Sequence, residues 1–226
     1  MKGNERKTEK KRSGNKGISA AFTLAIILFV VSGAISIPLL FRSFYYSHID
    51  WLDIEEKTGY EEVQIRESFD EMMDYCMGKT EEFGTGDLKW SAEGKSHFDD
   101  CKMLFTLDKI VLALGVVGAV ILGAFIRARG DNTLKPARRA GIIMLALGAV
   151  IGALGAMDFD AFFVKFHHTF FPGKDNWLFD PAKDEIIKIL PEEFFRNCAI
   201  LIVSVIVIAS ILLIVLPTFK RERRGE

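Results

Sequence analysis

The sequence predicts an all-α, polytopic membrane protein with four transmembrane helices and two extracytoplasmic helical segments. Four runs without a charged residue cover positions 17–41, 110–126, 140–157 and 197–219. An α-helix needs roughly 20 apolar residues to cross the hydrocarbon core of a membrane. The 29 Lys+Arg and 30 Asp+Glu residues are confined to the segments between these runs. This clustering argues against a soluble, disordered or nucleic-acid-binding protein.

The segments that flank the runs alternate between basic and acidic character. Residues 1–17 carry seven Lys/Arg and two acids, 127–139 carry five and one, and 220–226 carry four and two. The two remaining segments hold 25 of the 30 acids but only 13 of the 29 basic residues. Because basic segments stay on the cytoplasmic side of a membrane, both termini are predicted to be cytoplasmic.

In chain order, we expect a single membrane domain over residues 1–226. A basic cytoplasmic leader (1–17) precedes the first span (18–41), an extracytoplasmic segment (42–102), the second span (103–126) and a cytoplasmic loop (127–139). The third span (140–157), a second extracytoplasmic segment (158–196), the fourth span (197–219) and a cytoplasmic tail (220–226) follow. The first span resembles a signal peptide, but its apolar run continues to Phe41, so an uncleaved anchor is predicted.

The first extracytoplasmic segment is predicted to contain two helices. The pattern Thr58-Gly59-Tyr60-Glu61 is typical of a capping box, and the apolar positions Ile65, Phe69, Met72 and Cys76 follow at helical spacing. An amphipathic helix is therefore expected here. Ser91 is expected to cap a second helix, which carries residues 97–102 and continues into the second span.

The second extracytoplasmic segment opens with six phenylalanines between positions 159 and 171, interrupted by one lysine and two histidines. This composition is too polar to span a membrane and too apolar for a free loop, so it favours a helix or re-entrant segment at the interface. Pro172-Gly173 is expected to end it. Pro181 then begins a short helix that ends near Leu190, and Pro191 begins the fourth spanning helix.

The second and third spans are predicted to form an antiparallel hairpin, because only 13 residues join them. Small residues recur at every fourth position in both spans: Gly115, Ala119 and Gly123 in one, and Gly148, Gly152 and Ala156 in the other. Such spacing lets helix backbones approach closely in lipid.

Two sites carry ionisable residues near membrane depth, where burial is costly and a function is the first hypothesis. Asp100 follows His97 by three residues and shares its helical face, so the carboxylate can hold the imidazole in one tautomer. In the pair His167-His168, only one ring can point toward the same side as Phe163. A polar side chain in a wet interface is the alternative for each site.

The three cysteines do not predict a disulfide framework. Cys76 and Cys101 can face the oxidising side, but both occupy apolar helical positions, which favours buried free thiols. A metal site built from His97, Asp100, His167 and a fourth group has no recognised short spacing between ligands. No metal and no cofactor are predicted.

Four blocks of the sequence resemble the Lit family, the lipoprotein intramolecular transacylases of bacterial membranes. They are 97–102 (His-Phe-Asp-Asp-Cys-Lys), 166–171 (Phe-His-His-Thr-Phe-Phe), 177–181 (Trp-Leu-Phe-Asp-Pro) and 191–195 (Pro-Glu-Glu-Phe-Phe). The similarity covers nearly the whole chain after the basic leader. Phe98 and Cys101 replace the family's usual Met and Val, one apolar residue for another.

The resemblance implies that the protein moves the sn-2 acyl chain of a diacylglyceryl lipoprotein onto the α-amine of its N-terminal cysteine, giving the lyso form. It implies two catalytic histidines, His97 and His167, whereas His168 falls on a variable position. Chemistry agrees, since an α-amine with a pKa near 8 needs a base of imidazole-like strength. Lys102 is a candidate to hold the oxyanion, and Asp100 to orient His97.

The predicted partners are diacylated bacterial lipoproteins and membrane lipid, with no nucleic acid. Acyl chains are expected to contact Trp177 and the phenylalanines of the aromatic segment: Phe163, Phe166, Phe170 and Phe171. Arg42 and Arg196 lie at the outer ends of spans one and four, where they can meet lipid carbonyls or snorkel. The expected location is the bacterial cytoplasmic membrane, with the active site at the outer leaflet.

Two other functions compete with this hypothesis. The first is a non-catalytic membrane protein that binds a lipoprotein or another partner on the same surface. The second is a metal-dependent membrane hydrolase that uses the same histidines. Catalysis by the two histidines needs both rings and no metal, a binding protein tolerates their loss, and a metal hydrolase fails with chelators.

Overall fold

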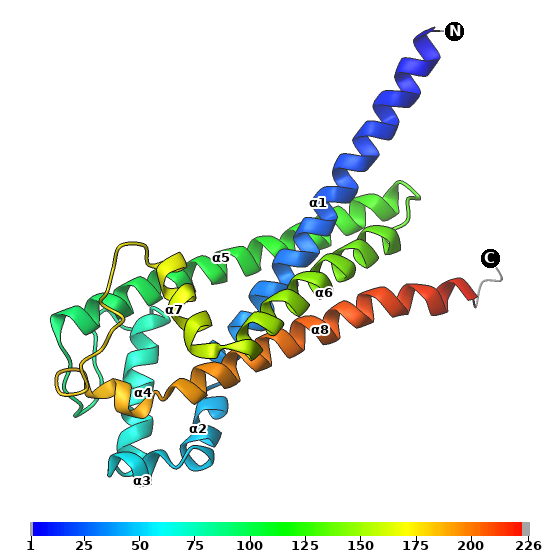
Figure 1. Ribbon diagram of the computed structural model, residues 1–226. Coiled ribbons are helices and arrows are strands. Elements are labelled where there is room, and N and C mark those ends of the chain that lie inside the picture. Colours follow the sequence, from blue (N-terminus) through cyan, green and yellow to red (C-terminus); the bar gives the residue numbers. More distant parts are fainter. Residues whose placement is uncertain (1, 223–226) are drawn as a thin grey trace. The chain divides into compact units, whose positions relative to one another are not determined.

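A computed structural model describes the backbone of residues 2–222 and the side chains of residues 16–216. The described backbone is helical, with no β-strand (Figure 1), which confirms the predicted fold class. The elements are α1 (Lys2–Leu40), α2 (Arg42–Trp51), α3 (Ile54–Thr58), α4 (Glu62–Cys76), α5 (Ala92–Ala128), α6 (Leu134–Met157), α7 (Phe159–Phe170), the 3₁₀ helix η1 (Glu185–Ile189) and α8 (Glu192–Glu222).

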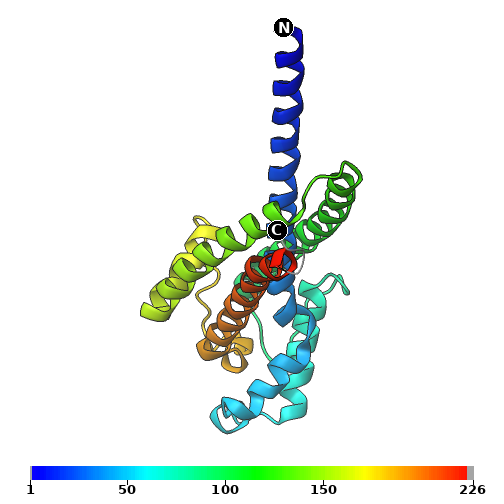
Figure 2. The same ribbon diagram turned by 90° about the vertical axis from the view of Figure 1, so that its right-hand side faces the viewer.

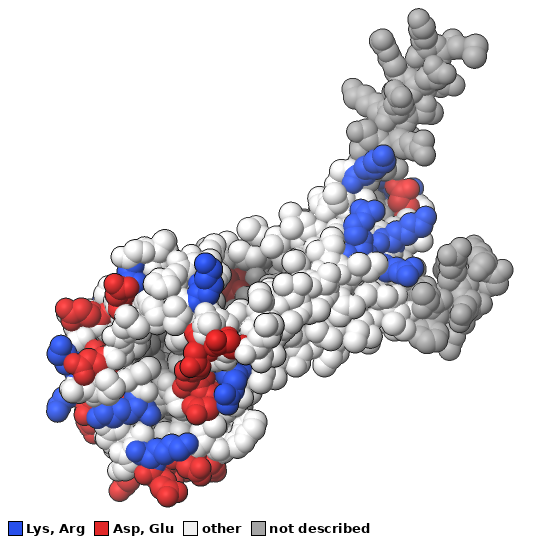
Figure 3. All heavy atoms as spheres, viewed as in Figure 1, with Lys and Arg blue, Asp and Glu red and all other residues white. Residues whose placement is uncertain are grey.

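Four of the described helices are long and apolar enough to cross a membrane, as predicted: α1 over Lys16–Leu40, α5, α6 and α8. Many of their large apolar side chains are exposed, among them Leu114, Val120, Leu147, Leu154 and Leu212. Figure 3 shows such surface as white spheres without charge. Exposed apolar surface of this kind suits contact with lipid chains.

The chain forms two compact units. Unit 1 comprises residues 1–34, 110–151 and 203–226, and unit 2 comprises residues 35–109 and 152–202. All of the candidate site residues from the sequence belong to unit 2.

Unit 1 is held by aliphatic contacts and by glycines that admit a neighbouring helix. Its core contains Phe22 and Ile26 of α1, Ile126 of α5 and Met144 of α6. A Cβ at Gly115 would meet the backbone of Phe29 in α1, and a Cβ at Gly141 would meet the backbone oxygen of Ser210 in α8.

The small residues of spans two and three lie against two other helices, and the predicted hairpin of these spans stays a prediction. The small residues of α5 face α1, since Gly118 and Gly123 lie against Ala25 and Phe22. Those of α6 face α8, where Gly148 contacts Ile206. Small residues give close helix approach as expected, but their spacing in the sequence does not name the helix that approaches.

In unit 2, α2, α3 and α4 fold together as a group (Figures 1 and 2). The predicted amphipathic stripe is confirmed, because all four of its residues are buried: Ile65, Phe69, Met72 and Cys76. The capping box is not formed. Thr58 ends α3 and Gly59 adopts φ +74°, so α4 begins instead after Glu61, whose side chain makes no capping hydrogen bond.

Two contacts fix the start of α5. The sequence predicts the first, a cap by Ser91, but not the second, which involves Asp184. The Ser91 hydroxyl accepts a hydrogen bond from the Gly94 amide at 3.0 Å, which is the expected N-cap. The Asp184 carboxylate accepts bonds from the Ser91 amide (2.7 Å) and hydroxyl (2.9 Å). It lies so close to Gly94 that a Cβ there would clash. Residues 91 and 184 are thus held together before α5 begins.

The aromatic segment forms α7, as predicted. Asp158 caps it by accepting a hydrogen bond from the Ala161 amide at 2.9 Å. After Phe170, a loop over residues 171–184 leads to η1, which ends at Ile189 close to the expected position.

Candidate active site

His97 and His167, 70 residues apart in the sequence, lie side by side in unit 2. Their ring centroids are 5.7 Å apart with an interplanar angle of 33°. Each side chain is only 6% exposed. His97 stands in the second turn of α5, and His167 in the last turn of α7. The structure therefore brings the two predicted histidines into one buried site.

Aromatic side chains enclose both imidazoles. The Trp177 indole stacks on the His167 imidazole, with ring centroids 4.5 Å apart. The centroid of the Phe163 ring lies 4.2 Å from that of the same imidazole. Phe171 presents its edge to His97 at 5.0 Å. Since these contacts cover the ring faces, they fix how each imidazole is oriented.

The hydrogen bond of His167 defines its tautomer. Its Nδ1 lies 2.8 Å from the backbone oxygen of Phe163, and a carbonyl can only accept a hydrogen bond. Nδ1 therefore carries the proton, and Nε2 of the neutral ring keeps a lone pair. Burial lowers the pKa of His167 by more than the hydrogen bond to Phe163 raises it, and the neighbouring His168 also lowers it. The ring is therefore neutral near pH 7.

One of the two ring nitrogens of His97 has a partner. Nε2 lies 3.5 Å from Sγ of Cys101, one helical turn further along α5. Nδ1 is buried and makes no hydrogen bond within the described part of the chain. Because an unsatisfied buried polar atom costs about 1–3 kcal/mol, Nδ1 is the ring atom of His97 whose hydrogen-bonding capacity is unused.

Asp100 does not make the expected hydrogen bond to His97. Its Oδ1 accepts a bond from Nζ of Lys174 at 2.5 Å, and its Oδ2 one from the Asn176 amide at 3.1 Å. The ammonium group offers a full charge, which outcompetes a neutral imidazole for the carboxylate. Asp100 thus fastens the loop after α7 to α5.

Lys102 contacts Thr80 and Tyr75. Its Nζ donates to the backbone oxygen of Thr80 at 3.3 Å and stands 4.1 Å above the Tyr75 ring. Lys174 is the lysine whose charge acts on His97. The loop after α7 thus places a cation beside His97, and the role of Lys102 in holding the oxyanion stays a prediction.

The predicted acyl-binding aromatics fall into two groups. Phe163, Phe171 and Trp177 pack against the imidazoles. Phe166 and Phe170 contact each other, with ring centroids 4.6 Å apart, and are 41% and 50% exposed. These two are the only exposed side chains among the five predicted aromatics.

The His168 side chain is exposed. Among the ring contacts of the described residues, it makes one, an edge-to-face contact with Trp177 at 5.7 Å between ring centroids. Adjacent helical residues point about 100° apart, which explains why His167 is buried and His168 is not.

The two predicted arginines occupy different environments. Arg42 forms ion pairs with Asp70, at 2.8 Å, and with Asp74, both on α4. These carboxylates engage the guanidinium, and the two interpretations of Arg42, contact with lipid carbonyls or snorkelling, stay predictions. Arg196 is exposed at the start of α8.

Sequence reasoning missed three residues of the site: Lys174, Asn176 and Cys101. Cys101 carried a signal, since it follows His97 by four residues on one helical face. The other two lie in a loop without periodicity. All three cysteines are free thiols, and no group of three or more His, Cys, Asp or Glu in the described chain is arranged to hold a metal ion.

Comparison with known proteins identifies the fold. The chain matches the family model of lipoprotein intramolecular transacylase Lit over residues 20–195. It resembles the solved structure of the membrane-integral Lit from Bacillus cereus with TM-score 0.88 and 26% identity, over 95% of this chain and 99% of that one.

Two structures of the same Bacillus cereus protein with one histidine replaced also match. The arginine variant gives TM-score 0.84 at 25% identity, over 99% of this chain and 100% of the other. The alanine variant gives 0.83 at 25%, over 97% and 100%. A search of curated protein sequences found no match. The chain belongs to the Lit family of lipoprotein intramolecular transacylases, which are membrane-integral enzymes.

Proposed function

We propose that this transacylase moves the sn-2 acyl chain of a diacylglyceryl lipoprotein onto the α-amine of the lipoprotein's N-terminal cysteine. The observation that carries the proposal is the juxtaposition of His97 and His167 at 5.7 Å in a buried site. Nucleophile and ester belong to one substrate, so the enzyme has to supply positioning, a base and oxyanion stabilisation. These two rings and Lys174 offer all three.

His167 acts as the general base in this proposal. Its Nδ1 proton is engaged by the Phe163 carbonyl, so the lone pair on Nε2 is free to take a proton. Burial keeps the ring neutral. The attacking α-amine has to shed a proton as its nitrogen bonds to the ester carbonyl carbon, and an imidazole has the right strength to take it.

His97 acts as the donor to the oxyanion. When the Cys101 thiol donates to Nε2 of His97, the proton of the neutral ring resides on Nδ1, which has no partner in the described protein. An N–H there can hold the negative oxygen of the tetrahedral intermediate. The Lys174 ammonium adds positive charge to the same region.

The proposed reaction needs no second reactant, because every bond and proton is accounted for within the lipoprotein and His167. The amine nitrogen bonds to the carbonyl carbon and gives a proton to Nε2 of His167. The bond between that carbon and the sn-2 glyceryl oxygen then breaks, and the proton on His167 passes to the leaving oxygen. The products are an amide on the cysteine and a free sn-2 hydroxyl, and His167 is neutral again.

The remaining aromatics of α7 define a route for the acyl chain. Phe166 and Phe170 lie one and three residues from His167 and expose apolar surface. We propose that the transferred chain lies along this pair. Phe163, Phe171 and Trp177 then hold the imidazoles and contact substrate only next to the reacting ester.

We also propose that the site faces the outer leaflet of the bacterial cytoplasmic membrane, with both termini inside. The support is the clustering of Lys/Arg in 1–17, 127–139 and 220–226. In a cysteine-free background, a membrane-impermeant thiol reagent should label a cysteine placed in residues 79–89 but not one in 131–133. Labelling at both positions, or the reverse pattern, would contradict this orientation.

A labelled lipopeptide tests the reaction most directly. A synthetic diacylglyceryl-cysteine peptide with a deuterated sn-2 chain is incubated with the purified protein, and the N-terminal product is analysed by mass spectrometry. We expect the deuterated chain on the α-amine. Label in a free fatty acid would indicate hydrolysis, unlabelled amide would indicate transfer from sn-1, and unchanged substrate would favour a binding protein.

A further inference from the structure

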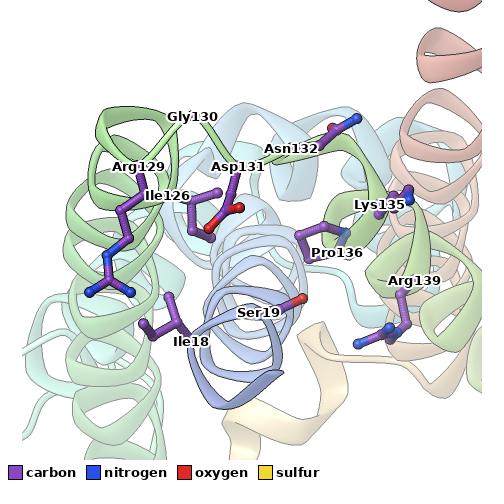
Figure 4. Close-up of a pocket in the computed structure, with 10 residues that line it drawn as sticks. All are labelled: Ile18, Ser19, Ile126, Arg129, Gly130, Asp131, Asn132, Lys135, Pro136 and Arg139. Carbon is purple, nitrogen blue, oxygen red and sulfur yellow. The ribbon is translucent and has the colours of Figure 1, made fainter. Parts of the chain in front are cut away.

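A second site lies in unit 1, at the turn between α5 and α6. It is a cavity of about 410 Å³ lined by the end of α5, the loop at 130–132, the first turns of α6 and residues 18 and 19 of α1 (Figure 4). Cavities of about 300–1,000 Å³ are typical of small-molecule sites. This one contains none of the residues of the proposed reaction.

The lining is strongly basic. Arg129, Lys135 and Arg139 contribute three positive charges, and Asp131 contributes the one negative charge. Lys135 and Arg139 form no ion pair with any residue whose side chain the structure describes. The cavity therefore has an excess of cationic groups that a bound anion can neutralise.

Neutral groups complete the chemistry of the cavity. The Ser19 hydroxyl and the Asn132 side chain can donate hydrogen bonds, and the Asn132 carbonyl oxygen already caps the Leu134 amide at 2.7 Å. Ile126 and Pro136 also line the cavity, and both are buried. A lining with cationic and apolar side chains matches a ligand with an anionic head and an apolar body.

The position along the chain places this cavity at a membrane surface. Its residues lie where the uncharged runs 17–41, 110–126 and 140–157 reach their charged ends. Apolar side chains on the adjoining turns are exposed, among them Ile121, Phe125 and Ile142, and can lie beside acyl chains. In Figure 4, Lys135 and Arg139 both come from the first turns of α6, on the same side of α1.

We propose that this cavity binds the phosphodiester headgroup of an anionic phospholipid. Basic pockets between spanning helices recognise such headgroups, and each Lys or Arg near an anionic surface contributes about 1 kcal/mol. The inference is independent of the transacylase reaction. It assigns a lipid ligand to a part of the protein that contacts no lipoprotein substrate in the proposed mechanism.

The test uses the full-length protein in an uncharged detergent, titrated with phosphatidylglycerol or with phosphatidylcholine that has the same acyl chains. Binding is measured by native mass spectrometry, and protection by the midpoint of thermal unfolding. We expect phosphatidylglycerol to bind and to raise the midpoint by several degrees, while phosphatidylcholine does so weakly. Equal binding of both lipids would overturn the proposal.

Matched variants localise the site. In Lys135→Gln/Arg139→Gln, affinity for phosphatidylglycerol should fall about 30-fold, at about 1 kcal/mol for each charge. In Arg127→Gln/Arg138→Gln, the same charge is lost from exposed positions that do not line the cavity, and affinity should fall less than threefold. Equal losses in the two variants would show general attraction to the surface and contradict a defined site.

Two further arms keep the test decisive. Asp131→Asn removes the negative charge of the lining and should strengthen phosphatidylglycerol binding, a gain that misfolding cannot mimic. Unchanged or weaker binding in a folded Asp131→Asn protein would contradict the proposal. Inorganic phosphate at matched ionic strength should not protect, and protection equal to that by lipid would assign the cavity to free phosphate instead.

Discussion

Unit 1 and unit 2 are packed by different interactions. In unit 1, helices approach through glycines, as at Gly115 against Phe29 and Gly141 against Ser210, and aliphatic side chains fill the rest. In unit 2, rings stack on rings and charged groups are paired, as in Trp177 on His167. The first kind of contact depends on shape alone, whereas the second fixes the direction of individual polar atoms.

This difference matches what each unit has to do. Helices in lipid gain little from burying apolar groups, so close backbone contact is the main way to hold them together. Acyl transfer needs nitrogen atoms at defined positions, because a misplacement of 1 Å can cost about 100-fold in rate. We therefore expect substitutions in unit 1 to change stability first, and substitutions in unit 2 to change activity first.

The largest effect on stability is expected at Gly115. Gly115→Ala places a methyl group against the Phe29 backbone, which cannot move aside as a side chain can. Overpacking of this kind costs about 1–3 kcal/mol, seen as a lower midpoint of thermal unfolding in detergent. Gly148→Ala is the matched control, since its nearest neighbour would lie at an ordinary 3.6 Å. Equal midpoints for the two variants would show that close packing does not dominate unit 1.

The loop contact in unit 2 should affect activity more than stability. Asp100→Asn weakens the bonds that hold Lys174 and Asn176, so the loop that carries Trp177 is less well placed. Because Lys174 is half exposed, solvent screens the pair, and we expect a roughly fivefold to tenfold loss in kcat/KM. Lys174→Gln should lose a similar amount, and the double variant little more. Full additivity would mean that the two residues act separately.

The sequence predicts the spanning helices well but not the loop contacts of the site in unit 2, and the reasons are physical. Charge-free runs revealed α1, α5, α6 and α8 because spanning a membrane imposes length and composition. Helical geometry, together with the family resemblance, favoured His167 over His168 as the functional histidine. No pattern in the sequence indicates the pairing of Asp100 with Lys174. The loop after Pro172 lacks the regular spacing of apolar residues that marks a helix or strand, and its path depends on the completed fold.

Burial of His167 should appear in the pH dependence of stability. Its pKa is lowered in the folded protein, so the unfolded chain binds the proton more tightly. The stabilisation is present above the ordinary histidine pKa of about 6.5 and is lost as the pH falls toward the folded value. The unfolding midpoint of the parent should drop more between pH 7.5 and 5 than that of His167→Gln. A parallel drop in both proteins would mean that the ring is not buried neutral.

The smallest effect is expected at Cys101. Cys101→Val keeps the apolar volume but removes the weak thiol donor to Nε2 of His97, so the useful tautomer is favoured less. We expect a loss of about twofold to fivefold in kcat/KM, corresponding to about 0.5–1 kcal/mol. Cys198→Val removes a free thiol of α8 instead of the thiol beside His97, and it should have no effect. A dead Cys101→Val enzyme would instead point to a direct chemical role for the thiol.

The central claim is that His97 and His167 work as one unit that excludes His168. The decisive measurement is the rate of amide formation on a diacylglyceryl-cysteine peptide, followed by mass spectrometry for His97→Gln, His167→Gln, the double variant and the matched control His168→Gln, at equal amounts of folded protein. Residues that act together are strongly non-additive, so each single variant should lose about 10²–10⁴-fold and the double variant little more, while His168→Gln keeps most of its activity. Retained activity in either His97→Gln or His167→Gln, or a dead His168→Gln enzyme, would contradict the account.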